Sequence, residues 1–216
     1  MNALILDIET FALDDAAEYI DEPTAPANYK DQEKIAAYVA DAKAKAISKC
    51  ALDVDLCRIV AIGYSGIAGT GVEVCGHENQ ERGLLAEMWI AATKLGQYDG
   101  FCGFNILAFD LPVLIRRSQY LGVDVPRMAL NLDKYRTPHI DLMERLSFNG
   151  KVKYRSLDFY CRRFGISVPD DTSGKDIDAL VRAGDWAAVE AHCRADIQKT
   201  RLLAERLGVL AGQEVA

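Results

Sequence analysis

The chain has 216 residues, a formal net charge of −7 and a composition that is 50% hydrophobic, which favours one compact domain with a sizeable core. No stretch approaches the roughly 18 apolar residues of a membrane helix, and the short N-terminal apolar run contains Asp7, so we expect a soluble, cytoplasmic protein without a signal peptide or a membrane partner. The negative charge means that contact with a polyanion has to rely on local basic patches or bound metal.

The first predicted element is a buried strand over residues 4–10, in which an apolar run leads into Asp7 and Glu9. Side chains alternate between the two faces of a strand, so both acids project from the same side. Neighbouring carboxylates in a partly dry site resist ionisation unless a cation compensates them. The pattern therefore indicates a divalent metal and phosphate chemistry, against the simpler interpretation of a strand that ends in solvated acids.

The segment from about residue 11 to residue 27 is acidic and contains prolines, which predicts a solvated loop. Asp31 suits the N-cap of a helix that runs to about Cys50. Apolar residues recur there at helical spacing, at Ile35, Val39, Ala42 and Ala46. We treat residues 11–50 as an insertion of a loop and a helix, whose role the sequence does not indicate.

The middle of the chain alternates strands and helices. A hairpin is expected from residues 58–65 and 71–75, because a glycine-rich turn separates them. A helix over residues 80–95 places four apolar residues on one face: Leu85, Met88, Ala92 and Leu95. A short strand over residues 100–105 and a helix over residues 111–121 complete this part.

The last third predicts a weak strand at residues 139–142, followed by helices over residues 156–164, 176–183 and 186–207. His139 and Asp141 form an H-x-D pair, which we interpret as structural because it lacks a third ligand nearby. The six cysteines have no metal-binding spacing and are expected to be reduced thiols. No repeat or linker indicates a second domain, so one α/β layered domain is the simplest fold.

Two further acids and a histidine could join Asp7 and Glu9 in one site. Asp110 falls at a strand-to-helix junction, although an Asp there could equally cap the helix. His192 and Asp196 are four residues apart and so share one helix face, where they could also be a simple exposed pair.

Three ordered motifs, Asp7-x-Glu9, Asn105-x3-Phe109-Asp110 and His192-x3-Asp196, resemble those of the DEDD superfamily of 3′-5′ exonucleases. The chain is most similar to the predicted exonucleases related to the proofreading domain of family B DNA polymerases. The resemblance implies a ribonuclease-H-like fold, which is a mixed β-sheet flanked by α-helices in a single α/β domain. It also implies hydrolysis from the 3′ end of single-stranded DNA, with release of nucleoside 5′-monophosphates.

The same resemblance implies a catalytic site that holds two divalent cations, Mg²⁺ or Mn²⁺, through Asp7, Glu9, Asp110 and Asp196. Asp7 would bridge the two ions, Glu9 and Asp196 would complete the site of the ion that activates water, and Asp110 would hold the second ion. The superfamily has one branch with His five positions before the last acid and another with Tyr four positions before it. His192 combines the spacing of the second branch with the residue of the first, and it is our candidate general base or water-orienting group.

Substrate-binding residues are expected beside two of these motifs and in one basic segment. Phe11 follows the first motif and could stack on the terminal nucleotide or simply pack beneath the loop. The basic segment has interleaved tyrosines and is either a phosphate-binding surface or a solvated face. The full candidate set is Thr10, Phe11, Asn105, Lys151, Lys153 and Arg155.

Three other functions are compatible with the sequence. The metal site indicates phosphate chemistry without a clear reader of the 2′-hydroxyl, so an exoribonuclease is an alternative. The unusual spacing of His192 leaves open a non-catalytic nucleic-acid-binding module of the same fold. A phosphatase with an aspartyl nucleophile would usually need a second Asp where this chain has Glu9.

Overall fold

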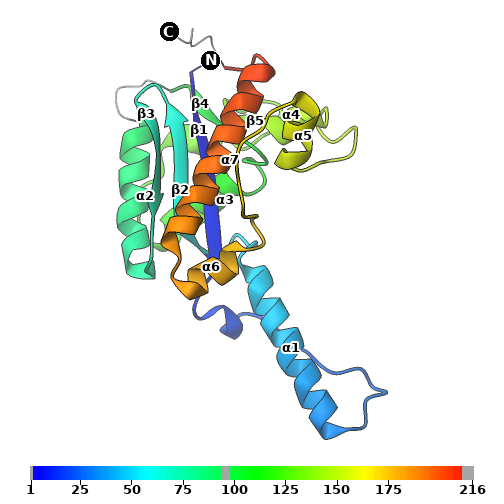
Figure 1. Ribbon diagram of the computed structural model, residues 1–216. Coiled ribbons are helices and arrows are strands. Elements are labelled where there is room, and N and C mark those ends of the chain that lie inside the picture. The colour runs from blue at the N-terminus through cyan, green and yellow to red at the C-terminus, as the bar shows by residue number, and fades with distance from the viewer. Residues whose placement is uncertain (1, 94–97, 211–216) are drawn as a thin grey trace.

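The computed structural model describes residues 2–93 and 98–210. Within these residues, five strands form one mixed sheet in the order β3-β2-β1-β4-β5 (Figure 1). The strands are β1 (Ala3–Ala12), β2 (Cys57–Gly66), β3 (Gly69–Val74), β4 (Gly100–Gly103) and β5 (Ile140–Asp141). β1 is antiparallel to β2 and parallel to β4, so the central strand joins an antiparallel half of the sheet to a parallel half.

Helices cover both faces of this sheet, as the alternating pattern predicted. The helices are α1 (Gln32–Cys50), α2 (Glu78–Thr93), α3 (Asp110–Tyr120), α4 (Leu142–Leu146), α5 (Leu157–Phe164), α6 (Ile177–Ala183) and α7 (Trp186–Arg206). Short 3-10 turns lie at Ala16–Glu18 and Arg127–Leu130. No helix among the described residues combines the length and the apolar character needed to cross a membrane.

The two faces of β1 enter different parts of the core. Leu4, Leu6 and Ile8 pack with residues of α2 and α3, whereas Ala3 and Ile5 pack with residues of α5 and α7. Because side chains alternate along a strand, Asp7 continues the row of Ala3 and Ile5 and faces the side of α7. The buried rows on both faces fix the register of β1 and with it the direction of the acids.

The helix α7 comes unusually close to the sheet at Gly63, the residue that pairs with Asp7 across β1 and β2. A Cβ atom at Gly63 would lie 2.5 Å from Cγ1 of Ile197 and 2.8 Å from Sγ of Cys193. Neither atom is the free end of a flexible chain, so any larger residue would have to push α7 outward. The absence of a side chain at Gly63 therefore lets α7 lie directly over the acidic part of β1.

Strand β1 extends further than the sequence predicted. Phe11 and Ala12 pair with Arg58 and Cys57, so the irregular segment expected from residue 11 begins only after Ala12. The bulge between Glu9 and Thr10 shifts the register there and lets the strand follow its partner to that point. The acidic composition of residues 11–27 predicted a solvated loop, but the side chains of Phe11 and Ala12 are buried.

The predicted helix beginning after Asp31 is present, and the Asp31 carboxylate accepts hydrogen bonds from the amides of Glu33 and Lys34. Its expected apolar face is not buried in the core, because Cys50 is its one buried residue. Figure 1 shows α1 projecting away from the body of the molecule. The other predicted elements agree within a few residues, except that Leu95, expected on the apolar face of α2, lies outside the described residues.

A buried ion pair fastens α2 to α3. The Arg117 guanidinium on α3 donates to both carboxylate oxygens of Glu81 on α2, at 2.9 Å from Nε and 2.6 Å from Nη2. The Glu81 carboxylate also accepts the amide of Ile59 in β2 at 2.9 Å. Glu81 thus ties two helices and one strand together beneath α3, the helix that begins with Asp110.

Candidate active site

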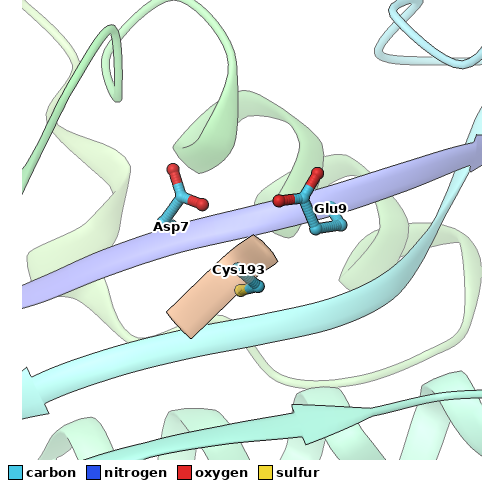
Figure 2. Close-up of side chains that lie close together, drawn as sticks. All are labelled: Asp7, Glu9 and Cys193. Atoms are coloured by element: carbon cyan, nitrogen blue, oxygen red, sulfur yellow. The ribbon is translucent and has the colours of Figure 1, made fainter. Parts of the chain in front are cut away.

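The first two acids meet on one face of β1. Figure 2 shows Asp7 and Glu9 projecting to the same side of the strand, with Cys193 of α7 beside them. One ligand-type atom from each of these three residues lies within 4.8 Å of the others. Glu9 is buried, whereas Asp7 keeps some contact with solvent. The prediction that the strand brings both carboxylates together is therefore confirmed by the geometry.

The third acid joins them from α3. Asp110 is the first residue of that helix, and its Oδ1 accepts the backbone amide of Ile8 at 3.1 Å. Ile8 lies between Asp7 and Glu9, so this hydrogen bond ties Asp110 to the acidic stretch of β1. The alternative that Asp110 serves as an ordinary helix cap is not supported, because α3 begins without a side-chain cap.

The loop that leads to Asp110 is held by Asp141 at the end of β5. The Asp141 carboxylate accepts the amides of Asn105 and Leu107, each at 3.1 Å. Nδ1 of His139 accepts the amide of Phe101 at 3.1 Å. The H-x-D pair thus has the structural role expected of it, and it shapes the approach to the third acid.

The electrostatics of the site show charge that the chain itself does not neutralise. Burial raises the pKa of Asp7 well above its usual value, and the carboxylates of Asp110, Glu9 and Asp196 raise it further. Burial, followed by the charge of Asp196, likewise raises the pKa of Glu9. Burial raises the pKa of Asp110 to about 7, against two backbone hydrogen bonds that lower it. These protons are the ones that a bound cation would displace.

Helix α7 contributes the last acid and the histidine. Nε2 of His192 lies 3.7 Å from Oε1 of Glu9, and the imidazole is buried. Oδ1 of Asp196 accepts a hydrogen bond from Nζ of Lys199 at 2.9 Å. Lys199 was not predicted as a site residue, although residues 192, 196 and 199 follow the i, i+4, i+7 pattern of one helix face.

Asp170, which lies between α5 and α6, was not predicted as a site residue either. Its carboxylate accepts Nζ of Lys199 at 2.7 Å and contacts Nδ1 of His192 at 3.1 and 3.2 Å. Burial alone would raise the pKa of Asp170, but hydrogen bonds from Lys199, His192 and Thr172 outweigh it and lower the pKa to about 2. No sequence signal could have placed Asp170 here, because its position depends on the path of an irregular segment.

Cys193 packs in the site without reactive chemistry. Its thiol is fully buried, and burial together with the neighbouring carboxylates raises its pKa well above the usual value. A protonated thiol is a poor ligand for the hard cations that prefer carboxylates. Cys193 therefore serves to fill the space between α7 and the sheet.

The substrate-binding candidates near the first two motifs are placed as follows. Thr10 is buried and its hydroxyl donates to the carbonyl of Ala51 at 2.5 Å. Phe11 is also buried, and the guanidinium carbons of Arg58 and Arg182 lie 5.2 and 5.1 Å from the centre of its ring. Asn105 is half-buried at the start of the loop to Asp110, with a backbone φ of 64°. The burial of Phe11 favours its packing role over stacking on a nucleotide.

The three basic candidates, Lys151, Lys153 and Arg155, lie exposed on the segment between α4 and α5. This segment leads into the first turn of α5, where the Asp158 carboxylate lies 3.1 Å from Nζ of Lys199. The guanidinium of Arg155 also stacks on the ring of Phe159, at 4.9 Å. The basic segment therefore approaches the site along α5 without joining the carboxylate cluster.

The carboxylates fit divalent cations. They offer oxygen ligands, which Mg²⁺ and Mn²⁺ prefer, and the raised pKa values of Asp7, Glu9 and Asp110 report negative charge that lacks a sufficient counter-charge. Lys199 is the one basic group among the main causes of the pKa shifts of Asp7 and Glu9, and it lowers both pKa values. A single ammonium group cannot balance four carboxylates, so the site has an excess of negative charge that bound cations would balance.

The excess of negative charge in the site predicts how stability changes with pH when the protein is kept free of metal. A carboxyl group with a raised pKa binds more protons in the folded state than in the unfolded state, so the free energy of unfolding falls as pH rises. The window runs from the ordinary Asp value of 3.8 to about 7, the value for Asp110. In chelator the melting temperature should fall across this window, by about 2–4 °C for each kcal/mol lost.

Thermal unfolding between pH 4 and 8, in chelator and in Mn²⁺, measures this effect. Mn²⁺ should raise the melting temperature more at pH 8 than at pH 4, because a cation displaces protons from the carboxyl groups more readily at the higher pH. The D110N variant should flatten the slope measured in chelator. A melting temperature in chelator that climbs steadily from pH 4 to 7 would contradict this account of the site.

Comparison with known proteins identifies relatives of this arrangement. Residues 51–214 match the model of a family described as "Predicted 3'-5' exonuclease related to the exonuclease domain of PolB". A DNA polymerase of Red sea bream iridovirus is 24% identical over 162 residues, which cover 65% of this chain and 17% of the polymerase. The family match begins after α1, so Asp7 and Glu9 lie outside it.

The fold has a counterpart among solved structures. The family B DNA polymerase from the hyperthermophilic archaeon Pyrobaculum calidifontis superposes with a TM-score of 0.63 and 17% sequence identity. The match covers 96% of this chain and 24% of the polymerase chain. It confirms the predicted ribonuclease-H-like α/β fold. The chain thus spans no more than about a quarter of either polymerase that it matches.

Proposed function

We propose that this chain removes nucleotides from the 3′ end of single-stranded DNA. The chain belongs to the family of predicted 3′-5′ exonucleases related to the exonuclease domain of PolB. The products would be nucleoside 5′-monophosphates. The observation that carries the proposal is the convergence of Asp7, Glu9, Asp110 and Asp196, from three separate elements, into one electrostatically coupled group.

The four acids would hold two divalent cations, Mg²⁺ or Mn²⁺, which supply an activated water and stabilise charge on the phosphate. Asp7 is central to this role, because the other three acids all raise its pKa. The charge of Asp196 on α7 acts on Glu9, and Asp110 accepts the amide of Ile8, the residue between Asp7 and Glu9. The chain's contribution is to hold these oxygens at fixed positions before substrate arrives.

His192 is the group that would receive a proton from the attacking water or orient that water. Its Nε2 faces Glu9, and its burial means that it can act only within the acidic group and not at the surface. This placement suits either role. The exposed segment with Lys151, Lys153 and Arg155 would contact phosphates further along the strand, because it leads toward the site through α5.

The proposal is tested with strands labelled at the 5′ end, one of DNA and one of RNA with the same sequence, incubated with Mn²⁺ or with chelator. We expect stepwise shortening of the DNA from its 3′ end in Mn²⁺ only. Faster loss of the RNA would reassign the substrate to RNA. Binding without shortening of either strand would overturn the enzymatic proposal in favour of a nucleic-acid-binding module. A small phosphate ester serves as the control substrate and should stay intact.

A further inference from the structure

We propose that Asp170 is a positioning residue of this site, which holds His192 and Lys199 of α7 in the orientation that the acids require. The inference rests on the proposed function, because it concerns the same site. It adds a fifth acid, which lies on the segment between α5 and α6 and acts through two other side chains.

The contacts of Asp170 leave its carboxylate no freedom to turn. The side chain is 7% exposed, although its backbone belongs to the irregular segment between α5 and α6. One oxygen accepts the Thr172 amide at 3.2 Å and hydroxyl at 3.0 Å, and the other accepts Nζ of Lys199 at 2.7 Å. Both oxygens contact Nδ1 of His192. A buried carboxylate with this many hydrogen bonds has a fixed orientation, and it therefore fixes the side chains that bond to it.

The first consequence concerns the ring of His192. A neutral imidazole carries its hydrogen on one nitrogen, and a carboxylate beside Nδ1 places that hydrogen on Nδ1. Nε2 then presents its lone pair on the side of the ring that faces Glu9, 3.7 Å away. Without Asp170 the hydrogen could move to Nε2, which would turn a donor toward Glu9 and remove the acceptor from the site.

The second consequence concerns Asp196. Its Oδ1 is held by Nζ of Lys199 at 2.9 Å, and the same ammonium group is held by Asp170 at 2.7 Å. The third partner of Lys199 is Asp158 at 3.1 Å, whose side chain is 64% exposed and therefore contributes less. Asp170 thus fixes Lys199, and Lys199 in turn fixes the last of the four acids.

The group of Asp170, His192 and Asp196 does not itself suit a further metal ion. One atom from each residue lies within 4.8 Å of the others, which is a spacing that ligands of one ion could have. Lys199 already bonds to both carboxylates, so this group has its own positive charge. We therefore assign it to positioning and not to metal binding.

Two variants separate the consequences. D170A removes the partners of both His192 and Lys199. K199M removes the ammonium group with its bonds to Asp196, Asp170 and Asp158, and leaves the contact between Asp170 and His192. The matched control is D171A, at the exposed neighbouring acid. If D170A does not fold, D170N keeps the shape of the side chain, and its weaker acceptor should give the same changes at smaller size.

The tautomer of His192 is read from long-range ¹H–¹⁵N spectra in mildly alkaline buffer, which is practicable because the chain has 3 histidines. We expect an Nδ1-protonated ring in the wild type and in K199M, and a shift toward the Nε2-protonated ring in D170A. In DNA hydrolysis, kcat of D170A should fall by about 10- to 100-fold, with KM within about twofold of the wild type. D171A should match the wild type in both measurements.

The outcomes distinguish this inference from the function it rests on. A wild-type tautomer in D170A, or equal changes in D171A, would overturn the positioning role even in an active nuclease. The expected tautomer shift in a protein that degrades no DNA would support the positioning role and overturn the exonuclease proposal instead. A loss confined to the melting temperature in D170A would show a merely structural tie between the segment and α7, against the inference.

Discussion

Replacement of Asp7 by asparagine should lower metal-dependent hydrolysis of a DNA strand by about a thousandfold or more, without unfolding the protein. Cation-held oxygens stabilise transition-state charge by several kcal/mol, and about 4 kcal/mol corresponds to three powers of ten in rate. Asp7 should be the most sensitive position, because the charges of Asp110, Glu9 and Asp196 all act on it. Steady-state rates in Mn²⁺ measure the loss.

The same variant has an opposite effect on stability, which separates a site residue from a structural one. Ionisation of Asp7 is unfavourable in the folded protein without metal, because burial and three like charges raise its pKa. D7N should therefore melt at an equal or higher temperature than the wild type in chelator near pH 8, and gain less from Mn²⁺. D14N, at an exposed acid beyond the end of β1, is the matched control. Full activity in D7N would refute the assignment of the site.

The second large effect is expected on folding, from the variant R117A. It would leave the Glu81 carboxylate, which is 0% exposed, without its guanidinium partner, and uncompensated buried charges of this kind cost about 3–5 kcal/mol. Because α3 begins with Asp110, loosening of this helix should also weaken the metal-dependent gain in melting temperature. Urea unfolding monitored by circular dichroism measures the loss of stability.

The double variant E81Q/R117M tests whether charge is the cause. Glutamine keeps an oxygen that accepts the amide of Ile59, while methionine fills the volume of the arginine stem without a charge. We expect this double variant to recover most of the stability lost in R117A. An R117A protein as stable as the wild type would show that the buried pair does not fasten α2 to α3.

The parts of the site that the sequence predicted are those set by regular structure. Asp7 and Glu9 are separated by one residue in a strand, so alternation placed them on one face. His192 and Asp196 are one helical turn apart, and Lys199 continues the same face, so the helical spacing also contains a signal for Lys199. Whether the acids of the strand and those of the helix lie together depends on the strand order. That order was expected from the resemblance of the ordered motifs to a known family.

The parts that could not be predicted depend on irregular backbone or on packing between distant segments. Asp170 reaches the site through a segment without helical or strand periodicity. Phe11 lies in the core because β1 continues past a bulge, a local feature with no periodic signature. In α1 the periodicity correctly predicted a helix, but a helical pattern of mostly small apolar residues did not show whether its face would be covered.

The close contact of α7 with the sheet at Gly63 has a consequence for the order in which the protein becomes functional. Asp7 and Asp196 are separated by most of the chain, and they meet only when α7 rests on the strands over Gly63. Contacts between such distant segments form late in folding, since closing a long loop is entropically unfavourable. A nascent chain would therefore carry two acids on β1 from the start but have no complete cation site until its last long helix has docked.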